Sequence, residues 1–291
     1  CCRRGDGVLP NFIIIGAMKA GTTSLFQYLR QHPQVFMPDM KEPHFFSAEH
    51  NWHRGRGWYE ELFEEAGPAV AVGEASTGYT KHPIYQGIPE RMAKMLPEVR
   101  LIYLMRHPIE RMQSQYLDQT TIRDDHPLLE PESRSLRKAL TSDPSYLSFS
   151  MYAMQIEQYL DFFAREQLLL LTSDEFRQAR RPTLHKVFSF LGVDPHYAGA
   201  EQHEEFNQSE GRTMRKPLAR KLRQLPGYRR LTRPVPTALK KLHYRFTTTE
   251  ARRERVQIPD DLRAHLEELL RDDVRRLRTY MPADFHGWGI G

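Results

Sequence analysis

The sequence PNFIIIGAMKAGTTSLFQYL, residues 10–29, carries the strongest structural signal of the chain. Its apolar run at 12–15 predicts a short strand that is buried on both faces. A glycine-bounded turn at 16–21 follows, and three hydroxyl residues at 22–24 open a helix. Loop N–H groups, the positive end of the helix dipole and the hydroxyls then point at one spot. The unit therefore predicts a phosphate-binding cradle.

This loop keeps the glycine spacing of a Walker loop but not its lysine. A nucleotide triphosphatase needs Gly-x-x-x-x-Gly-Lys-[Ser/Thr], whose lysine reaches the β- and γ-phosphates. Here Thr22 takes the lysine position, and Lys19 is the only cation of the loop. Such a loop favours a 5′-phosphate with one further oxyanion group over a magnesium-bound triphosphate.

Strands alternate with helices along the rest of the chain. Apolar runs at 69–72, 100–105 and 168–172 predict strands, and 35–37 a short extended piece. Helices are predicted at 22–29, 52–63 (a surface helix), 89–96, 109–119, 152–163, 184–191 closed by Gly192, and 258–281. The polar stretch 121–148 is predicted to be a variable loop with a short helix near 136–140.

This alternation predicts an α/β fold with right-handed βαβ crossovers. The central parallel sheet would be flanked by helices on both faces, in a single P-loop-type domain that spans residues 1–291. Ligands of such sheets lie at the carboxyl ends of the strands. The segments 16–24, 73–76 and 106–114 all follow strands, so we expect them to face one cleft.

The motifs of the chain resemble those of sulfotransferases that use 3′-phosphoadenosine 5′-phosphosulfate (PAPS). GAMKAGTTSL at 16–25 is similar to their 5′-phosphosulfate loop. The resemblance continues in the family's order through KEPHFFS (41–47), VGEASTGYT (72–80), LIYLMRHPIERMQSQY (101–116) and FLGVDP (190–195). Lys-Glu-x-His-Phe-Phe places it nearest to the heparan-sulfate-type and related bacterial enzymes. The resemblance implies PAPS as cofactor, 3′-phosphoadenosine 5′-phosphate (PAP) as its product, and no metal.

In-line sulfonate transfer to an acceptor hydroxyl requires positioning and charge stabilisation. Lys19 is predicted to stabilise the leaving phosphate, because the loop places its ammonium against the phosphosulfate. The resemblance implies that Glu42 is the base for the acceptor proton. It also matches His44 to the motif histidine, which orients Glu42 or the acceptor. The alternatives are a surface Lys-Glu pair for Glu42 and a packed side chain for His44.

The cofactor is predicted to be held by two units, 8–30 for the 5′-phosphosulfate and 100–120 for the 3′-phosphate. An arginine at a strand end and a serine eight residues later can converge on one phosphate, and the family uses this pair. The alternative for the arginine is a helix-capping ion pair. Gly211-Arg212 resembles the Gly-Arg element of the family that closes over the 3′-phosphate. The predicted cofactor-binding residues are Lys19, Ala20, Gly21, Thr22, Thr23, Ser24, Arg106, Ser114, Gly211 and Arg212.

Three positions depart from the heparan-type pattern. Ser47 stands where many of those enzymes have aspartate, Ala75 where they have lysine, and Thr23 where some have arginine. The acceptor therefore stays open between a saccharide, a lipid or polyketide hydroxyl and a small metabolite, with an anionic acceptor among the options.

Basic residues concentrate near the C-terminal end, in a predicted segment at 205–255. Residues 212–255 contain 15 Lys/Arg and 2 Asp/Glu. Such a segment attracts polyanions, and its alternative is a solvated, partly mobile loop. No RNA-binding or zinc-finger signature accompanies it, so no nucleic-acid partner is predicted. Rival functions are a P-loop kinase or other nucleotide phosphotransferase, and a non-catalytic nucleotide- or polyanion-binding protein.

Cys1 and Cys2 are the only cysteines, and adjacent cysteines cannot join distant parts of a fold. This predicts a reducing compartment and a cytoplasmic location; the alternative is the lumenal domain of a Golgi-type enzyme whose anchor is missing. The longest apolar run, 12–15, is far shorter than the roughly 20 residues of a transmembrane helix, so no transmembrane segment is predicted. No Cys/His metal-ligand spacing is present.

Overall fold

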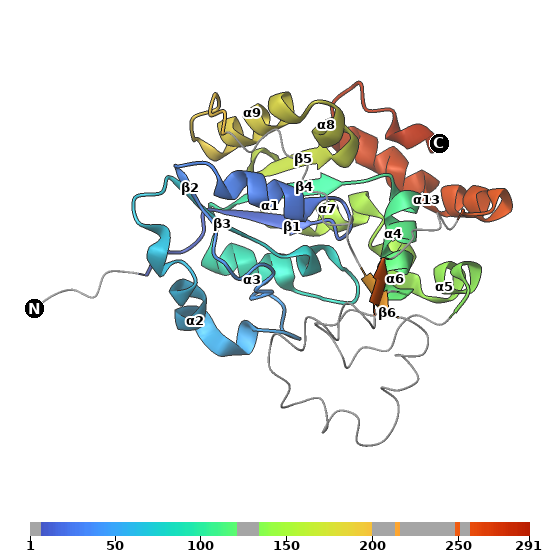
Figure 1. Ribbon diagram of the computed structural model, residues 1–291, viewed down its shortest axis with the longest axis horizontal. Coiled ribbons are helices and arrows are strands. Elements are labelled where there is room, and N and C mark those ends of the chain that lie inside the picture. Colours follow the sequence, from blue (N-terminus) through green and yellow to red (C-terminus); the bar gives the residue numbers. More distant parts are fainter. Residues whose placement is uncertain (1–6, 121–133, 200–212, 216–247, 251–256) are drawn as a thin grey trace, which may run out of the picture.

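A five-stranded parallel sheet forms the centre of the molecule (Figure 1). The structure is a computed structural model that describes residues 7–120, 134–199, 213–215, 248–250 and 257–291. The strand order is β2-β3-β1-β4-β5, and every neighbouring pair is parallel. The strands are β1 (Phe12–Gly16), β2 (Val35–Phe36), β3 (Ala71–Ala75), β4 (Arg100–Met105) and β5 (Leu168–Thr172). The predicted α/β fold class is confirmed.

Helices cover both faces of this sheet. They are α1 (Thr22–Arg30), α2 (Gly55–Glu61), α3 (Ile88–Met95), α4 (Pro108–Thr120), α5 (Leu136–Ser142), α6 (Pro144–Ser148), α7 (Tyr152–Leu160), α8 (Ser173–Gln178), α9 (Arg180–Leu191) and α13 (Asp260–Tyr280). Side chains of β4 alternate between the faces. Tyr103 makes a ring contact with Tyr152 of α7. Leu104 points the other way, toward Gly21 at the start of α1.

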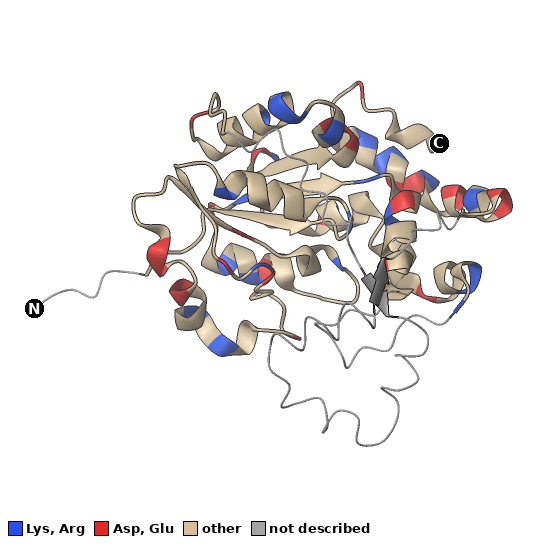
Figure 2. Cartoon of the chain, in the orientation of Figure 1, with Lys and Arg blue, Asp and Glu red and all other residues tan. Residues whose placement is uncertain are grey.

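Continuous apolar runs form the central strands because both faces of each strand are buried. All five residues of β1 are buried, as are five of the six residues of β4. Charges of both signs lie along the outer helix α13 (Figure 2), whose apolar positions Leu262, Leu266, Leu270, Val274 and Leu277 are buried. Gly192 ends α9 in the left-handed conformation, as predicted.

The predicted surface helix 52–63 lies at the surface with one inward face: residues 53–57 are exposed, and the helix itself, α2, is shorter than predicted. A 3-10 turn, η1 (Trp52–Arg54), precedes α2, and both Tyr59 and Phe63 are fully buried. The ring of Phe45 stacks on Tyr59 at 4.2 Å between centroids. This distant partner covers Tyr59, and the local pattern could not reveal it.

The strand predicted at 69–72 is displaced toward the C-terminus. β3 continues through Gly73 and Glu74 to Ala75. The sequence Gly-Glu suggested a turn, but three hydroxyl groups satisfy the buried carboxylate of Glu74 inside the strand.

The short helix predicted near 136–140 is confirmed as α5, but two segments predicted as loop contain further regular structure. Within the predicted loop 121–148, α6 follows α5 directly, because Asp143 caps it by accepting a hydrogen bond from the Ser145 amide. Within the basic segment, β6 (Thr213–Arg215) and β7 (Thr248–Glu250) form an antiparallel pair that was not predicted. The remainder of the predicted 205–255 segment lies outside the described residues.

Candidate active site

The loop between β1 and α1 adopts the cradle shape that its glycines predict. Gly21 precedes α1 at φ 103°, in the left-handed region that favours glycine. At the other end of the loop, a Cβ on Gly16 would lie 2.1 Å from Oγ1 of Thr80. At the start of α1, the amide of Leu25 donates a hydrogen bond to the Gly21 carbonyl. The first amides of a helix precede any acceptor at i−4 within it, so the start of α1 is its positive end.

Lys19 and Arg106, the two predicted cofactor cations that lie within the described residues, are ion-paired to carboxylates of α4. Nζ of Lys19 lies 3.1 Å from Oδ1 of Asp118, and a guanidinium nitrogen of Arg106 lies 2.8 Å from Oε2 of Glu110. Ser114 lies between the two acids at four-residue spacing, on the same face of the helix. These side chains are between 14% and 41% exposed, so ligands can reach them. The ion pair named as the alternative for Arg106 is present.

The two cations come from neighbouring strands. β1 and β4 are hydrogen-bonded to each other, Lys19 follows the first and Arg106 follows the second. Ala17 donates a 2.7 Å backbone hydrogen bond to Leu104 of β4, which ties the cradle to the neighbouring strand. The carboxyl ends of adjacent strands therefore present two cations at one edge of the sheet.

A third cation, Arg111, lies inside α4 and was missed by sequence reasoning. Its guanidinium is fully buried and donates to Ser150 Oγ (2.6 Å), Gln115 Oε1 (2.9 Å) and the Tyr146 carbonyl (2.7 Å). Burial lowers the pKa of Arg111. Ser150 and Tyr146 fix α4 to the α6–α7 region, whereas Gln115 belongs to α4 itself. None of the three acceptors carries a charge, so the guanidinium adds positive potential to the helix that carries Ser114.

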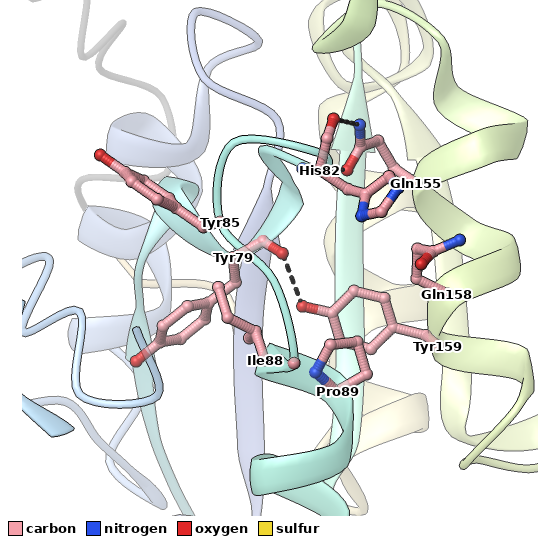
Figure 3. A pocket seen from close by; sticks show the side chains of 9 residues that line it. Tyr79, His82, Tyr85, Ile88, Pro89, Gln155, Gln158 and Tyr159 are labelled. Carbon is pink, nitrogen blue, oxygen red and sulfur yellow. Dashed lines mark hydrogen bonds between the residues drawn. The ribbon is translucent and has the colours of Figure 1, made fainter. Parts of the chain in front are cut away.

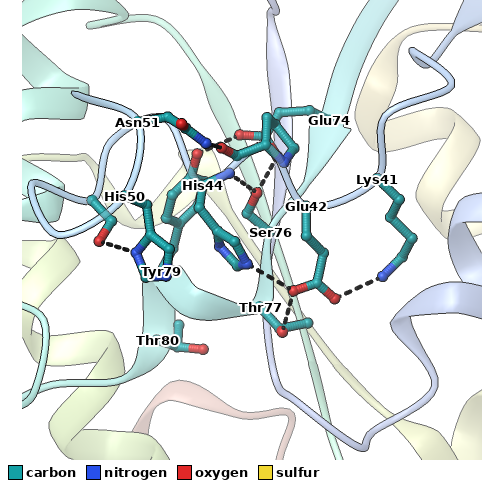
Figure 4. A network of polar contacts seen from close by, with 12 residues as sticks. Lys41, Glu42, His44, His50, Asn51, Glu74, Ser76, Thr77, Tyr79 and Thr80 are labelled. Carbon is teal, nitrogen blue, oxygen red and sulfur yellow. Dashed lines mark hydrogen bonds and ion pairs between the residues drawn. The ribbon is translucent and has the colours of Figure 1, made fainter. Parts of the chain in front are cut away.

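The motif Lys-Glu-x-His forms a loop, 41–47, against the end of β3 (Figure 4). The Glu42 amide donates to the Ala75 carbonyl (2.9 Å), and the His44 amide donates to Ser76 Oγ (3.0 Å). Both Glu42 (φ 63°) and His44 (φ 48°) have left-handed backbone, which is rare for residues other than glycine. Sequence spacing alone gives no sign of this conformation.

Three groups surround the Glu42 carboxylate. Lys41 Nζ lies 3.0 Å from Oε1, while His44 Nε2 and Thr77 Oγ1 lie 3.2 Å and 3.0 Å from Oε2. Burial alone would raise the pKa of Glu42, but the hydrogen bond to His44 and the charge of Lys41 outweigh it and hold the pKa well below its ordinary value. The side chain remains 31% exposed, so an acceptor can approach it. The predicted Glu42 and His44 thus meet, with Lys41 and Thr77 as partners that were not predicted.

The His44 ring is enclosed by its neighbours. A Cβ on Gly78 would lie 2.6 Å from Nδ1 of His44, so only glycine leaves room for the ring. Nδ1 is buried and has no hydrogen-bond partner among the described residues. The His50 ring lies 4.9 Å away, and Ser47 Oγ contacts His50 Nδ1 at 2.8 Å and Glu49 at 2.7 Å.

Behind this loop, Glu74 of β3 is a fully buried carboxylate. It accepts hydrogen bonds from Tyr79 (2.7 Å), Ser76 (2.8 Å) and Tyr59 (3.3 Å). Burial raises the pKa of Glu74 to about 7, although the three hydroxyl groups oppose the shift. Glu74, Ser76 and Tyr79 all belong to the segment VGEASTGYT at 72–80, which contains most of β3 and all of η3. The available signal was this run of hydroxyl residues directly after the glutamate.

A small pocket lies beside η3 (Thr77–Thr80), the turn that follows β3 (Figure 3). Tyr159 of α7 donates to the Tyr79 carbonyl at 2.9 Å, and Gln155 bonds both the amide and the carbonyl of His82. None of the predicted site residues lines this pocket. The hydrogen bond from Tyr159 helps to hold η3 in place, and η3 carries Thr77, which contacts Glu42.

Gly211 and Arg212, the predicted closing element, lie outside the described residues. Within the described ranges no cluster of three His, Cys, Asp or Glu side chains is arranged to hold a metal ion. No helix in the described part of the chain is long and apolar enough to cross a membrane.

The family described as "Sulfotransferase domain" matches residues 9–221 of the chain. Heparan sulfate glucosamine 3-O-sulfotransferase 3B1 of Mus musculus is 30% identical over 209 residues, which are 71% of this chain and 52% of that protein. Bifunctional heparan sulfate N-deacetylase/N-sulfotransferase 4 of Mus musculus is 29% identical over 213 residues, 66% of this chain and 23% of that protein. The chain spans about half the length of the first of these curated relatives and less of the second.

Solved structures show the same architecture. A sulfotransferase from Alicyclobacillus acidocaldarius has a TM-score of 0.69 and 26% identity, covering 97% of this chain and 99% of that one. Mouse sulfotransferase SULT7A1, solved in complex with PAP, has a TM-score of 0.52 and 14% identity, covering 93% and 85% of the two chains. The second likeness concerns the fold alone.

Proposed function

The chain belongs to the sulfotransferase family, and from this premise we propose that it transfers a sulfonate group from PAPS to an acceptor hydroxyl. One observation carries the proposal: two cations, Lys19 and Arg106, stand at the carboxyl ends of adjacent strands beside the positive end of α1. This is the charge pattern that a donor with phosphate groups at both its 5′ and 3′ ends requires.

The residues of the β1–α1 cradle fit the 5′ end of PAPS. Lys19 would exchange Asp118 for the phosphosulfate, and the amides and hydroxyls of residues 20–24 would complete the cradle. Bound there, PAPS supplies an activated sulfonate group. The ammonium of Lys19 would meet the charge that grows on the leaving phosphate oxygen.

The start of α4 fits the 3′-phosphate. Arg106 would exchange Glu110 for the phosphate, and Ser114 would donate its hydroxyl from one turn further along the helix. Buried Arg111 supports the same end by its charge. Gly211 and Arg212 remain proposed as the closing element on sequence grounds.

Glu42 is the proposed base. Its carboxylate is ionised across the physiological pH range, and it can accept the acceptor's proton as the new O–S bond forms. The low pKa makes Glu42 a weak base, so its position contributes more than its basicity. His44 orients the carboxylate through the contact between Nε2 and Oε2.

For the acceptor, a saccharide hydroxyl is favoured. The curated relatives are named for heparan sulfate, an anionic saccharide. Lys41 lies beside Glu42, where it could also receive an acidic group of the acceptor. A lipid or polyketide hydroxyl and a small metabolite are the remaining acceptor classes. Because the sequence carries no RNA-binding or zinc-finger signature, nucleic acid is not among the proposed partners.

The proposed location is the cytoplasm, because the chain has only two cysteines and they are adjacent. The alternative is a lumenal domain of a Golgi-type enzyme. Comparison of the tagged protein's distribution in cell fractions would distinguish the two.

Calorimetric titration tests the cofactor. We expect PAP to bind with low-micromolar affinity in the absence of metal, and Arg106→Ala to weaken it strongly. ATP, with and without Mg²⁺, serves as the control ligand. Failure to bind PAP together with Mg²⁺-dependent ATP binding would overturn the proposal in favour of a P-loop kinase, whose lysine this loop lacks at Thr22.

A further inference from the structure

The loop 41–47 is held at every second amide by the residues that follow Glu74. The amide of Glu42 donates to the Ala75 carbonyl, that of His44 to Ser76 Oγ, and that of Phe46 to the Tyr79 hydroxyl at 3.4 Å. From the other side, Asn51 donates to the Pro43 carbonyl at 2.7 Å. The loop that carries the proposed base therefore depends on a short stretch of β3 and η3 (Figure 4).

This dependence has an energetic reason. Glu42 and His44 both occupy left-handed backbone conformations, which are strained for residues other than glycine and persist only where the surroundings enforce them. If the amide contacts were lost, both residues would relax to ordinary φ values. Their side chains would then leave the positions in which Nε2 of His44 meets the Glu42 carboxylate.

Two of the three acceptors are themselves oriented by Glu74. Ser76 and Tyr79 each have one hydroxyl hydrogen, and each donates it to the Glu74 carboxylate, at 2.8 Å and 2.7 Å. Above its pKa of about 7 the Glu74 carboxylate is ionised, and an ionised carboxylate accepts hydrogen bonds and donates none. It therefore keeps both hydrogens turned inward and leaves the oxygen lone pairs free for the loop amides of His44 and Phe46.

We propose that Glu74 is a positioning residue for the transfer reaction, because it fixes the hydroxyl groups that hold the loop bearing Glu42 and His44. The inference rests on the proposed function and adds to it a residue that never touches the substrate. Tyr59 also donates to Glu74, but its hydroxyl bonds no loop amide. Tyr59 therefore provides a matched control.

Two variants each remove one hydroxyl group that donates a hydrogen bond to Glu74. Ser76→Ala also removes the acceptor of the His44 amide, whereas Tyr59→Phe removes no acceptor of a loop amide. The probes are labelled PAPS, heparan-type oligosaccharides as acceptor, and PAP for affinity. We expect Ser76→Ala to lower kcat roughly tenfold, the scale of one lost buried hydrogen bond. Its PAP affinity should stay within about twofold of wild type, because the cofactor cations lie on other strands. Tyr59→Phe should leave both unchanged.

Glu74→Gln keeps the size of the side chain but introduces an N–H₂ donor. That donor must point at a hydroxyl oxygen and so competes with the loop amides. We expect it to lower kcat as Ser76→Ala does. In the double variant the two losses should not add, because both act through the same contact.

Hydrogen exchange of the peptide 41–47 provides a readout that needs no activity. Ser76→Ala and Glu74→Gln should accelerate exchange there, whereas Tyr59→Phe should not. Equal effects of Ser76→Ala and Tyr59→Phe on exchange and on kcat would overturn the inference, since they would indicate a general structural role. A wild-type protein that binds PAP but transfers no sulfonate would instead count against the proposed function, and the exchange comparison would still decide the role of Glu74.

Discussion

The two halves of the site hold their charges in different ways. On the half proposed to bind the cofactor, Lys19 and Arg106 pair with acids of α4, and under the proposal a ligand phosphate replaces each acid. On the acceptor half, the carboxylates of Glu42 and Glu74 are held by short contacts to fixed hydroxyls, histidine and lysine. The first arrangement suits groups that must change partners in every reaction cycle. The second suits groups that must keep one position.

The comparison predicts its largest effect at Glu42. Glu42→Gln should lower kcat by roughly 10²–10⁴-fold, the usual contribution of a positioned base, and leave PAP affinity unchanged. Steady-state turnover and calorimetry on the same preparation measure the two. Glu90→Gln is the control, because Glu90 is an exposed acid that pairs only with Lys94 of its own helix among the described residues. A Glu42→Gln enzyme that retains most of its turnover would remove Glu42 from the role of base.

The next effect concerns stability and distinguishes the two acids of the acceptor half. The folded-state pKa of Glu74 lies near 7, above the unfolded value of 4.5. Its contribution to the free energy of unfolding is therefore complete below about pH 4.5 and falls as pH rises toward 7, by up to roughly 3 kcal/mol. Glu42 has the opposite sign, because its lowered pKa makes it lose stabilisation only as pH falls below the unfolded value.

Denaturant unfolding of wild type and Glu74→Gln between pH 5 and 8 measures this contribution. Subtracting one curve from the other cancels the titration of the histidines. Wild type should lose stability relative to the variant as pH rises. A difference that stays constant over this range would mean that Glu74 ionises at an ordinary pKa.

On the cofactor half, Arg106→Ala should weaken PAP binding by about 10–100-fold, the range expected for a charge-assisted contact. Glu110→Gln is the matched variant, because it removes the partner and leaves Arg106 in place. It should bind PAP at least as tightly as wild type. Calorimetry that finds both variants equally weakened would indicate that the ion pair serves the fold of α4 and not the ligand.

The smallest of these effects is a steric one on the acceptor half. Gly78→Ala places a methyl group 2.6 Å from Nδ1 of His44 and must displace the ring. We expect kcat to fall roughly tenfold and PAP affinity to stay the same, because no reacting group is removed. Gly57→Ala is the control, since an added Cβ there meets nothing within 4 Å. Loss of PAP affinity in Gly78→Ala would show that the two halves are coupled.

The strand–loop–helix units proposed to bind the cofactor were predictable because the residues of each unit are contiguous in the sequence. One strand, one glycine loop and one helix start lie within residues 10–29, and the second unit lies within 100–120. The strand at 100–105 was predicted with the bounds that the structure has. What the sequence could not predict there were the partners: the pairing of Lys19 with Asp118 joins residues about a hundred positions apart.

On the half proposed to bind the acceptor, only the residues of the resembling motif could be named from the sequence. Glu42 and His44 were named from a motif, but their left-handed backbone and their dependence on 75–79 are contacts between distant segments. Glu74 was expected at the end of a strand, at a turn, because a carboxylate inside a buried strand contradicts the usual pattern. Hydroxyls contributed by α2 and η3 explain the exception.

The acids of α4 bear on how the protein would respond to ionic strength. Because Lys19 and Arg106 already have carboxylate counterions, binding of PAP should release few salt ions to the solvent. The affinity for PAP should then depend less strongly on salt concentration than it would if Lys19 and Arg106 had no carboxylate partners. The displaced carboxylates of Asp118 and Glu110 would remain beside a polyanion and repel it. They should therefore hasten the departure of the spent nucleotide, the step that frees the enzyme for its next turnover.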